Sequence, residues 1–285
     1  MTGGLRRRLG NQQLARAQLG QPRLGHPQLG HQPLNRGRAN RPSEPPLLVW
    51  LRLKDASPRA LREVDRIVQA SIAIADEEGP TWLSMRHLAT ALATGTTSLY
   101  RYIKGRDELL ELMVDAVNGE SPWPNQPIPV APTGDWRADL GIIARGRRNQ
   151  FLRHPWLAGQ ATSRLALGPN TLRAAEFASA VVAQLSTDAT VAASILSAIL
   201  GFVHGAVADE LGELEAQRRT GISEEDWRLQ LGPYVQSLID GGRYPNFAEV
   251  VIKAEDLSYE RQFEFGLARL LDGIEAFVHQ ASSSP

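Results

Sequence analysis

The sequence lacks cysteine altogether over its 285 residues. Disulfide bonds, thiolate metal sites and thiol redox sensing are therefore excluded, and this composition is typical of the reducing cytoplasm. The sequence also has no Gly-rich phosphate loop, no G-x-S-x-G elbow and no H-E-x-x-H pair, and none of its six histidines pairs at metal-ligand spacing. We therefore expect no enzymatic activity, no bound metal and no cofactor.

The chain also lacks net charge, because 31 basic side chains balance 31 acidic ones. The two signs are nevertheless segregated, since residues 1–45 carry eight arginines and one glutamate, net +7, whereas the remainder is acidic. This Arg/Gln/Pro/Gly-rich segment has too few apolar residues for a core and is predicted to be a disordered tail. The alternatives stay open: a basic arm that adds non-specific DNA affinity, a tail without a function, or a start codon assigned too far upstream.

Long apolar runs are scarce in this sequence. Residues 47–51 are too few for a secretory signal, and Ala189–Ala208 is a single uncharged segment of membrane-spanning length. That segment is rich in small residues, contains His204 and is flanked by Asp188 and Asp209 instead of basic residues. We interpret it as a helix buried in a soluble, cytoplasmic all-α protein with no membrane partner; a membrane-anchored regulator is the weaker alternative.

The segment from Ser84 to Arg106 contains four cations and no acidic residue, so it can approach phosphates without electrostatic repulsion. Its pattern predicts two short helices joined by a tight turn. Upstream, Arg59–Glu78 has apolar residues at helical spacing and is followed by Gly79 and Pro80, which end a helix. Three helices in this order can share one small core, as in a helix-turn-helix.

Two motifs in this segment are specific. The second helix opens with a hydroxyl-x-Arg-x-Leu-Ala pattern, Ser84-Met85-Arg86-His87-Leu88-Ala89. From the third helix onward the pattern is Leu-Tyr-x-aromatic-aliphatic followed by Glu-Leu-Leu, Leu99-Tyr100-Arg101-Tyr102-Ile103-Lys104-Gly105-Arg106-Asp107-Glu108-Leu109-Leu110. With these motifs, residues 59–118 resemble the DNA-binding domain of the TetR family of one-component regulators. The resemblance implies a helix-turn-helix domain, assigned to residues 57–119, and double-stranded operator DNA as a partner.

Eight residues are predicted to contact DNA. Thr96, Thr97 and Ser98 open the third helix, where hydroxyl groups can reach base edges in the major groove. The resemblance implies a base or phosphate contact for Arg86 and assigns chiefly phosphate contacts to four further residues: Tyr100, Tyr102, Lys104 and Arg106.

The turn between the two short helices departs from the family pattern, which usually has glycine there. This chain has Ala93-Thr94-Gly95. Either Ala93 adopts a left-handed conformation, at a cost of roughly 1 kcal/mol, or the turn shifts toward Gly95. The register of the recognition residues depends on which of the two occurs.

The C-terminal half is predicted to be a second, helical domain. Residues 120–134 form a proline-rich connection, and residues 135–281 show helical patterns without an alternating strand pattern of useful length. Short motifs resemble the ligand-binding domain of the TetR subgroup nearest to the tetracycline repressor: Gly134-Asp135-Trp136-Arg137, Arg153-His154-Pro155-Trp156-Leu157 and Leu167-Gly168-Pro169-Asn170. We therefore expect an all-α protein with an N-terminal three-helix helix-turn-helix domain and a helical effector-binding and dimerisation domain.

Six aromatic or imidazole side chains of the second domain are candidates for an effector pocket: Trp136, His154, Trp156, Phe177, Phe202 and His204. For each of them, ordinary core packing is the competing interpretation, or capping in the case of the histidines.

The combined interpretation is a homodimeric transcriptional regulator, a repressor that a small-molecule effector releases from its operator. The alternative is a constitutive DNA-binding or activating regulator without an effector. We expect separate cores in the two domains, because the proline-rich connection divides them. Dimerisation is expected through residues 188–219 and 259–280, the second of which offers an apolar stripe: Phe263, Leu267, Leu270, Leu271, Ile274 and Phe277.

Overall fold

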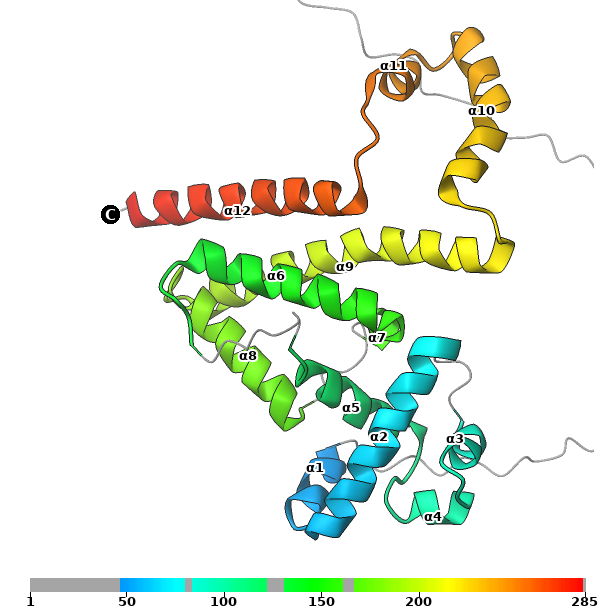
Figure 1. Cartoon of the computed structure of the whole chain (residues 1–285). Coiled ribbons are helices and arrows are strands. Elements are labelled where there is room, and N and C mark those ends of the chain that lie inside the picture. The colour runs from blue at the N-terminus through cyan, green and yellow to red at the C-terminus, as the bar shows by residue number, and fades with distance from the viewer. Residues whose placement is uncertain (1–46, 80–83, 122–130, 161–166, 284–285) are drawn as a thin grey trace, which may run out of the picture. The chain divides into compact units, whose positions relative to one another are not determined.

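The computed structural model describes residues 47–79, 84–121, 131–160 and 167–283. The regular elements in these ranges are all α-helices, as the sequence predicts (Figure 1). The predicted tail and residues 122–130 of the proline-rich connection lie outside the described residues. In chain order the helices are α1 (Leu47–Lys54), α2 (Pro58–Glu78), α3 (Met85–Ala91), α4 (Thr96–Tyr100), α5 (Arg106–Asn118), α6 (Trp136–Arg153), α7 (Pro155–Gln160), α8 (Pro169–Val182), α9 (Ala189–Thr220), α10 (Glu224–Asp240), α11 (Pro245–Lys253) and α12 (Tyr259–Ser283).

Several of these helices have a polar N-cap residue, whose side chain accepts hydrogen bonds from backbone N–H groups of the first turn. The Ser84 hydroxyl accepts from the His87 amide at 3.1 Å in α3, and the Asp188 carboxylate accepts from the Thr190 amide at 2.7 Å in α9. The same arrangement begins α2, α6 and α10, with these residues: Ser57, Asp135 and Ser223. Local sequence therefore fixes where these helices start.

The helices of the helix-turn-helix, α2, α3 and α4, pack on one apolar core together with α5. Ile67 of α2, Leu88 of α3 and Leu99 of α4 are each at most 2% exposed. Ile103 follows Leu99 by four residues and is fully buried. These anchors hold one side of α4 against the core and turn its other side outward.

The turn between α3 and α4 is a Schellman motif that contains Ala93. The Thr94 amide donates to the Ala89 carbonyl at 2.9 Å, and the Ala93 amide donates to the Thr90 carbonyl at 3.0 Å. Ala93 has a φ angle of +50°, whereas Gly95 is extended and is the N-cap residue of α4. Of the two alternatives for this turn, the left-handed alanine is therefore the one that occurs.

Ala93→Gly is expected to raise the free energy of unfolding by about 0.5–1 kcal/mol. The strain of a left-handed alanine, roughly 1–2 kcal/mol, exceeds the roughly 0.4–1 kcal/mol that glycine costs by adding entropy to the unfolded chain. Urea unfolding followed by circular dichroism measures the difference. Ala91→Gly, at an exposed helical position of α3, is the matched control and should lower the same free energy by about 1 kcal/mol. A loss of stability in Ala93→Gly would contradict a strained turn.

The C-terminal helices enclose a second group of buried apolar side chains. α6, α8 and α12 all pack against α9. Leu140 and Phe151 of α6, and Ile199 and Val203 of α9, are each at most 2% exposed. The long helix α9 is therefore the centre of this part of the chain.

The two groups of buried side chains are continuous, so the expectation of separate cores is wrong. Buried residues from Val49 in α1 to Ile274 in α12 form one cluster. The reason lies in α5, which contacts both α2 and α8 and whose Leu109, Met113 and Val117 are at most 1% exposed. A change in the C-terminal helices can therefore reach the helix-turn-helix through packed side chains.

The apolar stripe of α12 does not form the outward dimerisation surface that the sequence predicts. It packs inside the chain against α9 and α6, and four of its six residues are at most 7% exposed: Phe263, Leu267, Leu271 and Ile274. Phe277, at 48% exposed, does point outward, as does Phe265 at 67%. Periodicity identifies the apolar face of a helix, but it does not identify what covers that face.

The helix α9 has the length and composition of a membrane-spanning segment, and among the described residues it is the one helix that does. One face carries apolar residues packed in the core: Ile195, Ile199, Val203 and Val207. The opposite face is exposed and consists of small residues, which we call the small-residue face: Ala193, Ser197, Gly201, Gly205 and Ala208. In the single chain α9 is thus a packed helix with one uncovered face.

Candidate nucleic-acid interface and the residues behind it

The outward side of α4 carries hydroxyl groups. Thr96 and Thr97 are exposed in its first turn, and Ser98 is half-buried. Tyr100, at the end of the helix, is 48% exposed. Exposed hydroxyls at the start of a short helix have the placement that contact with base edges requires.

Cationic side chains flank this surface. Arg86 of α3 and Lys104, which follows α4, are exposed, and Arg106 is exposed at the start of α5. Tyr102 is half-buried and packs against the core. The structure therefore places the predicted DNA-contacting residues on α3, on α4, on the turn after α4 and at the first residue of α5.

One carboxylate behind this surface belongs to Glu108, in the first turn of α5. Its side chain is 14% exposed, forms an ion pair with Arg52 of α1 and accepts a hydrogen bond from the Lys104 amide at 3.2 Å. Arg52 Nη1 also donates to the Tyr102 carbonyl at 2.9 Å. Because the carboxylate is paired behind the surface, it opposes phosphate approach less than an exposed acid would.

A polar cluster joins the end of α2 to the start of α7. His154 Nδ1 lies 2.9 Å from Asp76 Oδ1, and His154 Nε2 lies 3.0 Å from Glu120 Oε2. Trp156 Nε1 donates to Asp76 Oδ1 at 2.8 Å. Both His154 and Trp156 are buried, so two of the predicted effector residues have partners in the helix-turn-helix part of the chain.

The charge of His154 depends on these carboxylates. Burial lowers the pKa of the imidazole, but the hydrogen bonds and charges of Asp76 and Glu120 outweigh burial and raise its pKa above the ordinary value. A group with a raised folded-state pKa stabilises the fold below its unfolded-state pKa, about 6.5, and this stabilisation is lost as the pH rises through the folded-state value. In thermal unfolding scans, His154→Gln should therefore lower the melting temperature more at pH 6 than at pH 9. Equal losses at both pH values would contradict a charged imidazole in this cluster.

The other four predicted effector residues lie among the C-terminal helices. His204 Nε2 is 3.0 Å from a main-chain carbonyl of α7, and its ring packs edge-on against Phe151 at 5.9 Å between centroids. The Phe202 ring lies 5.4 Å from an aromatic ring of α12. Trp136 of α6 and Phe177 of α8 are half-buried and pack against the core.

Two arginines of α6 add charge to this interior. Arg148 Nη2 pairs with Glu210 Oε2 at 2.7 Å. Arg147 lies over the Phe151 ring, 4.5 Å from its centroid, and donates to Asn118 Oδ1 at 3.0 Å. Burial lowers the pKa of Arg147 to about 10. A mostly apolar interior with a few placed polar groups is typical of ligand-binding regions.

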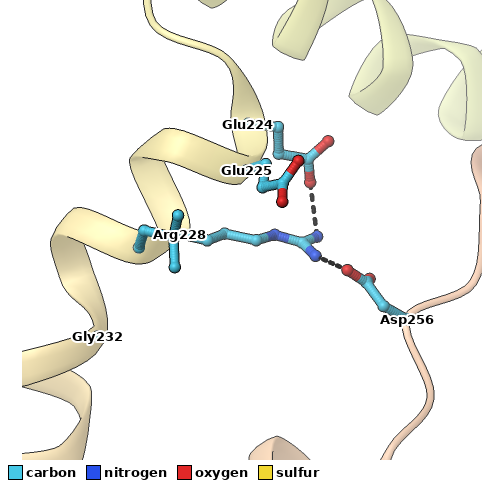
Figure 2. Close-up of a pocket in the computed structure, with 6 residues that line it drawn as sticks. Glu224, Glu225, Arg228, Gly232 and Asp256 are labelled. Atoms are coloured by element: carbon cyan, nitrogen blue, oxygen red, sulfur yellow. Dashed lines mark hydrogen bonds and ion pairs between the residues drawn. The ribbon is translucent and has the colours of Figure 1, made fainter.

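Two surface hollows also occur in the C-terminal part. One, of about 590 Å³, lies beside α10, where Figure 2 shows Arg228 between Glu224 and Asp256, with which it forms ion pairs. The other, of about 320 Å³, lies between α6 and α12, where Arg145 pairs with Glu264 at 2.7 Å. None of the six predicted effector residues lines either hollow.

The fold and its outward α4 define a helix-turn-helix DNA-binding protein, and the C-terminal part matches a known family. Residues 128–278 fit the family described as tetracyclin repressor-like, C-terminal domain. The HTH-type transcriptional repressor DrrR1 of Streptomyces coeruleorubidus is 40% identical over 227 residues, which cover 78% of this chain and 81% of that protein. The chain belongs to the TetR family and is a DNA-binding transcriptional regulator.

Solved structures of ActR from Streptomyces coelicolor are similar as well. The structure without ligand has a TM-score of 0.63 at 30% identity and covers 76% of this chain and 97% of ActR. The complex of ActR with actinorhodin has a TM-score of 0.61 at 32% identity, and the match covers 75% of this chain and 97% of ActR. Both similarities extend over the greater part of the chain.

Proposed function

We propose that the protein is a cytoplasmic repressor that binds its operator as a homodimer and leaves it when a small-molecule effector binds. The observation that carries this proposal is one continuous core that links the outward surface of α4 to the helices around α9. The name of the similar repressor DrrR1 supports repression, and the complex of ActR with actinorhodin supports an effector site among the C-terminal helices.

In this proposal, residues 57–119 are the DNA-binding domain and residues 135–281 are the effector-binding and dimerisation domain. Thr96, Thr97 and Ser98 read base edges, since they lie at the start of α4. Arg86 contacts a base or a phosphate, and four residues hold the phosphate backbone: Tyr100, Tyr102, Lys104 and Arg106.

Homodimerisation is supported by surfaces that the single chain leaves uncovered. α9 exposes its small-residue face, which allows a second helix to approach closely. α12, which packs against α9, exposes Phe265 and Phe277. A second copy that covers these surfaces would bring two α4 helices into one assembly, as successive major grooves about 34 Å apart require.

Coupling between effector binding and DNA binding would use two hydrogen-bonded contacts between helices, which we call joints. At the first, the buried Asp115 of α5 accepts hydrogen bonds from Thr171 at 2.8 Å and from Asn170 at 3.1 Å, at the start of α8. At the second, His154 and the neighbouring α7 hold the end of α2. An effector that prefers one arrangement of the C-terminal helices shifts the population of DNA-binding states by its differential affinity.

Release of operator DNA tests the proposal. The operator is first selected from random duplex DNA, and its release is followed by fluorescence anisotropy with actinorhodin as the first compound and a panel of aromatic compounds after it. Phe202→Trp and His204→Ala should raise the concentration of compound needed for release. The operator affinity of each variant without effector is measured alongside, because the continuous core can transmit a change around α9 to the helix-turn-helix. Leu172→Ala, at an exposed position of α8, is the control.

The outcomes separate the two functional alternatives. Release curves identical to that of the wild type would remove Phe202 and His204 from the effector site. If no compound releases the wild-type protein, a constitutive DNA-binding regulator without an effector becomes the better description.

A further inference from the structure

The short helix α1 precedes the helix-turn-helix, which begins with α2, yet it makes contacts with several other segments. Val49 is 1% exposed and belongs to the continuous core, whereas Leu51 is 65% exposed on the outer side. Arg52 and Trp50 reach from α1 to residues far along the chain. α1 is therefore docked on the fold through specific side chains.

The first contact holds the end of the recognition segment. Arg52 Nη1 donates to the Tyr102 carbonyl at 2.9 Å, while the same guanidinium forms an ion pair with Glu108. Glu108 in turn accepts from the Lys104 amide at 3.2 Å. A guanidinium presents several donors in a fixed fork, so that one side chain can hold a carbonyl and a carboxylate together. The backbone between α4 and α5 is thus fixed from α1.

The second contact holds α5 and the start of α8. Trp50 Nε1 donates to Glu111 Oε1 at 2.6 Å. The other carboxylate oxygen of Glu111 is buried without a hydrogen-bond partner among the described residues, which makes the indole N–H important to that carboxylate. The Trp50 ring also lies close to Gly168, the N-cap residue of α8. A Cβ atom added to Gly168 would lie 2.5 Å from the ring.

We propose that α1 is a brace that sets operator affinity, with Arg52 and Trp50 as positioning residues. They hold the backbone of Tyr102 and Lys104 in the register that contacts DNA, by fixing it to α5 and α8. Arg52 acts through this backbone and does not itself contact DNA. This inference rests on the proposed function of operator binding. Loss of the brace lets the recognition segment move, so operator affinity falls while affinity for non-specific DNA is retained.

The experiment measures operator affinity of the full-length protein against salt concentration, with an operator selected by the wild-type protein. Arg52→Gln should weaken operator binding about tenfold, because charge-assisted hydrogen bonds to the recognition segment are lost, and should leave the slope of log affinity against log salt unchanged. Arg52→Lys keeps the charge without the fork and should have an intermediate effect. Lys54→Gln removes an exposed charge from the same helix and should bind as the wild type does.

Several outcomes would overturn the brace. Unchanged affinity in Arg52→Gln would do so, and so would a slope shallower by about 0.9, since that slope indicates a direct phosphate contact. If Arg52→Gln does not fold, Arg52→Lys and Trp50→Phe decide, since Trp50→Phe removes the N–H and retains an aromatic ring beside Gly168. Both of these variants must then weaken operator binding and leave the slope of log affinity against log salt unchanged. Failure of the wild type to select any operator would contradict the proposed function, whereas variants equal to wild type contradict the brace alone.

Discussion

A glutamate at Phe265 is expected to give a folded monomer, whereas a glutamate two positions further on, at Leu267, is expected to unfold the protein. Phe265 is 67% exposed and Leu267 is 1% exposed. Leu267→Glu puts an unpaired carboxylate into the core around α9, which should lower the free energy of unfolding by about 4 kcal/mol or more. Phe265→Glu leaves that core intact and places its charge in the proposed dimer interface.

Sedimentation and circular dichroism distinguish these results. Phe265→Glu should keep the helical signal, sediment as a monomer and lose operator affinity by about 100-fold or more, because the second half-site is no longer held at high effective concentration. Leu229→Glu, at a position of α10 that is 69% exposed, is the control and should remain a dimer. A dimeric Phe265→Glu protein with full operator affinity would mean that the interface lies on another surface.

Asp115→Ala is expected to lower the free energy of unfolding by about 3 kcal/mol, since three donors at the start of α8 lose their acceptor at about 1 kcal/mol each. The Asp115 carboxylate is 3% exposed and accepts from the Thr171 amide at 2.8 Å, from the Thr171 hydroxyl at 3.0 Å and from Asn170 Nδ2 at 3.1 Å. Water does not readily replace a buried acceptor, so the loss should be nearly complete.

Urea unfolding measures this effect. Glu176→Ala removes an exposed carboxylate from α8 and should change the free energy of unfolding by no more than about 0.5 kcal/mol. If Asp115→Ala changes the free energy of unfolding as little as this control does, the α5–α8 joint contributes little to the stability of the fold and is a poor route for coupling.

Local features of the fold follow well from the sequence. The spacing of apolar residues predicts helices, and Gly79 with Pro80 marks the end of α2, because each of these signals acts within one or two turns. The Ala93 turn is an instructive case. Its two alternatives were readable from the sequence, but the choice between them depends on how α3 and α4 pack.

Long-range features do not follow in the same way. One carboxylate partner of His154 is Asp76, which is 78 positions away along the chain, and no local pattern indicates such a pair. The spacing of apolar residues on α12 fits a dimer interface and an internal core equally well. Only the packing of α12 against α9 shows that most of these residues belong to the core. The DNA-contacting and effector-binding roles of the predicted residues stay predictions.

No individual helix is predicted at α1, and none is predicted at α11 within the helical region of residues 135–281. The run at the start of α1 is apolar but short. The helix is docked through hydrogen bonds that Trp50 and Arg52 donate to residues 61 and 50 positions away along the chain. α11 begins with Pro245 at its first position, which is a helix-start signal within the sequence.

Base recognition by the start of α4 is tested most directly by selecting sites from random duplex DNA with the wild-type protein and with Thr97→Ala side by side. The wild type should enrich a palindromic site whose half-sites lie one helical turn, about 34 Å, or a multiple of it apart. Thr97→Ala should keep that spacing and change base preference at the two symmetry-related positions, by about 1–3 kcal/mol at each. A wild-type pool without an enriched motif, or identical base preferences for both proteins, would contradict recognition by this helix.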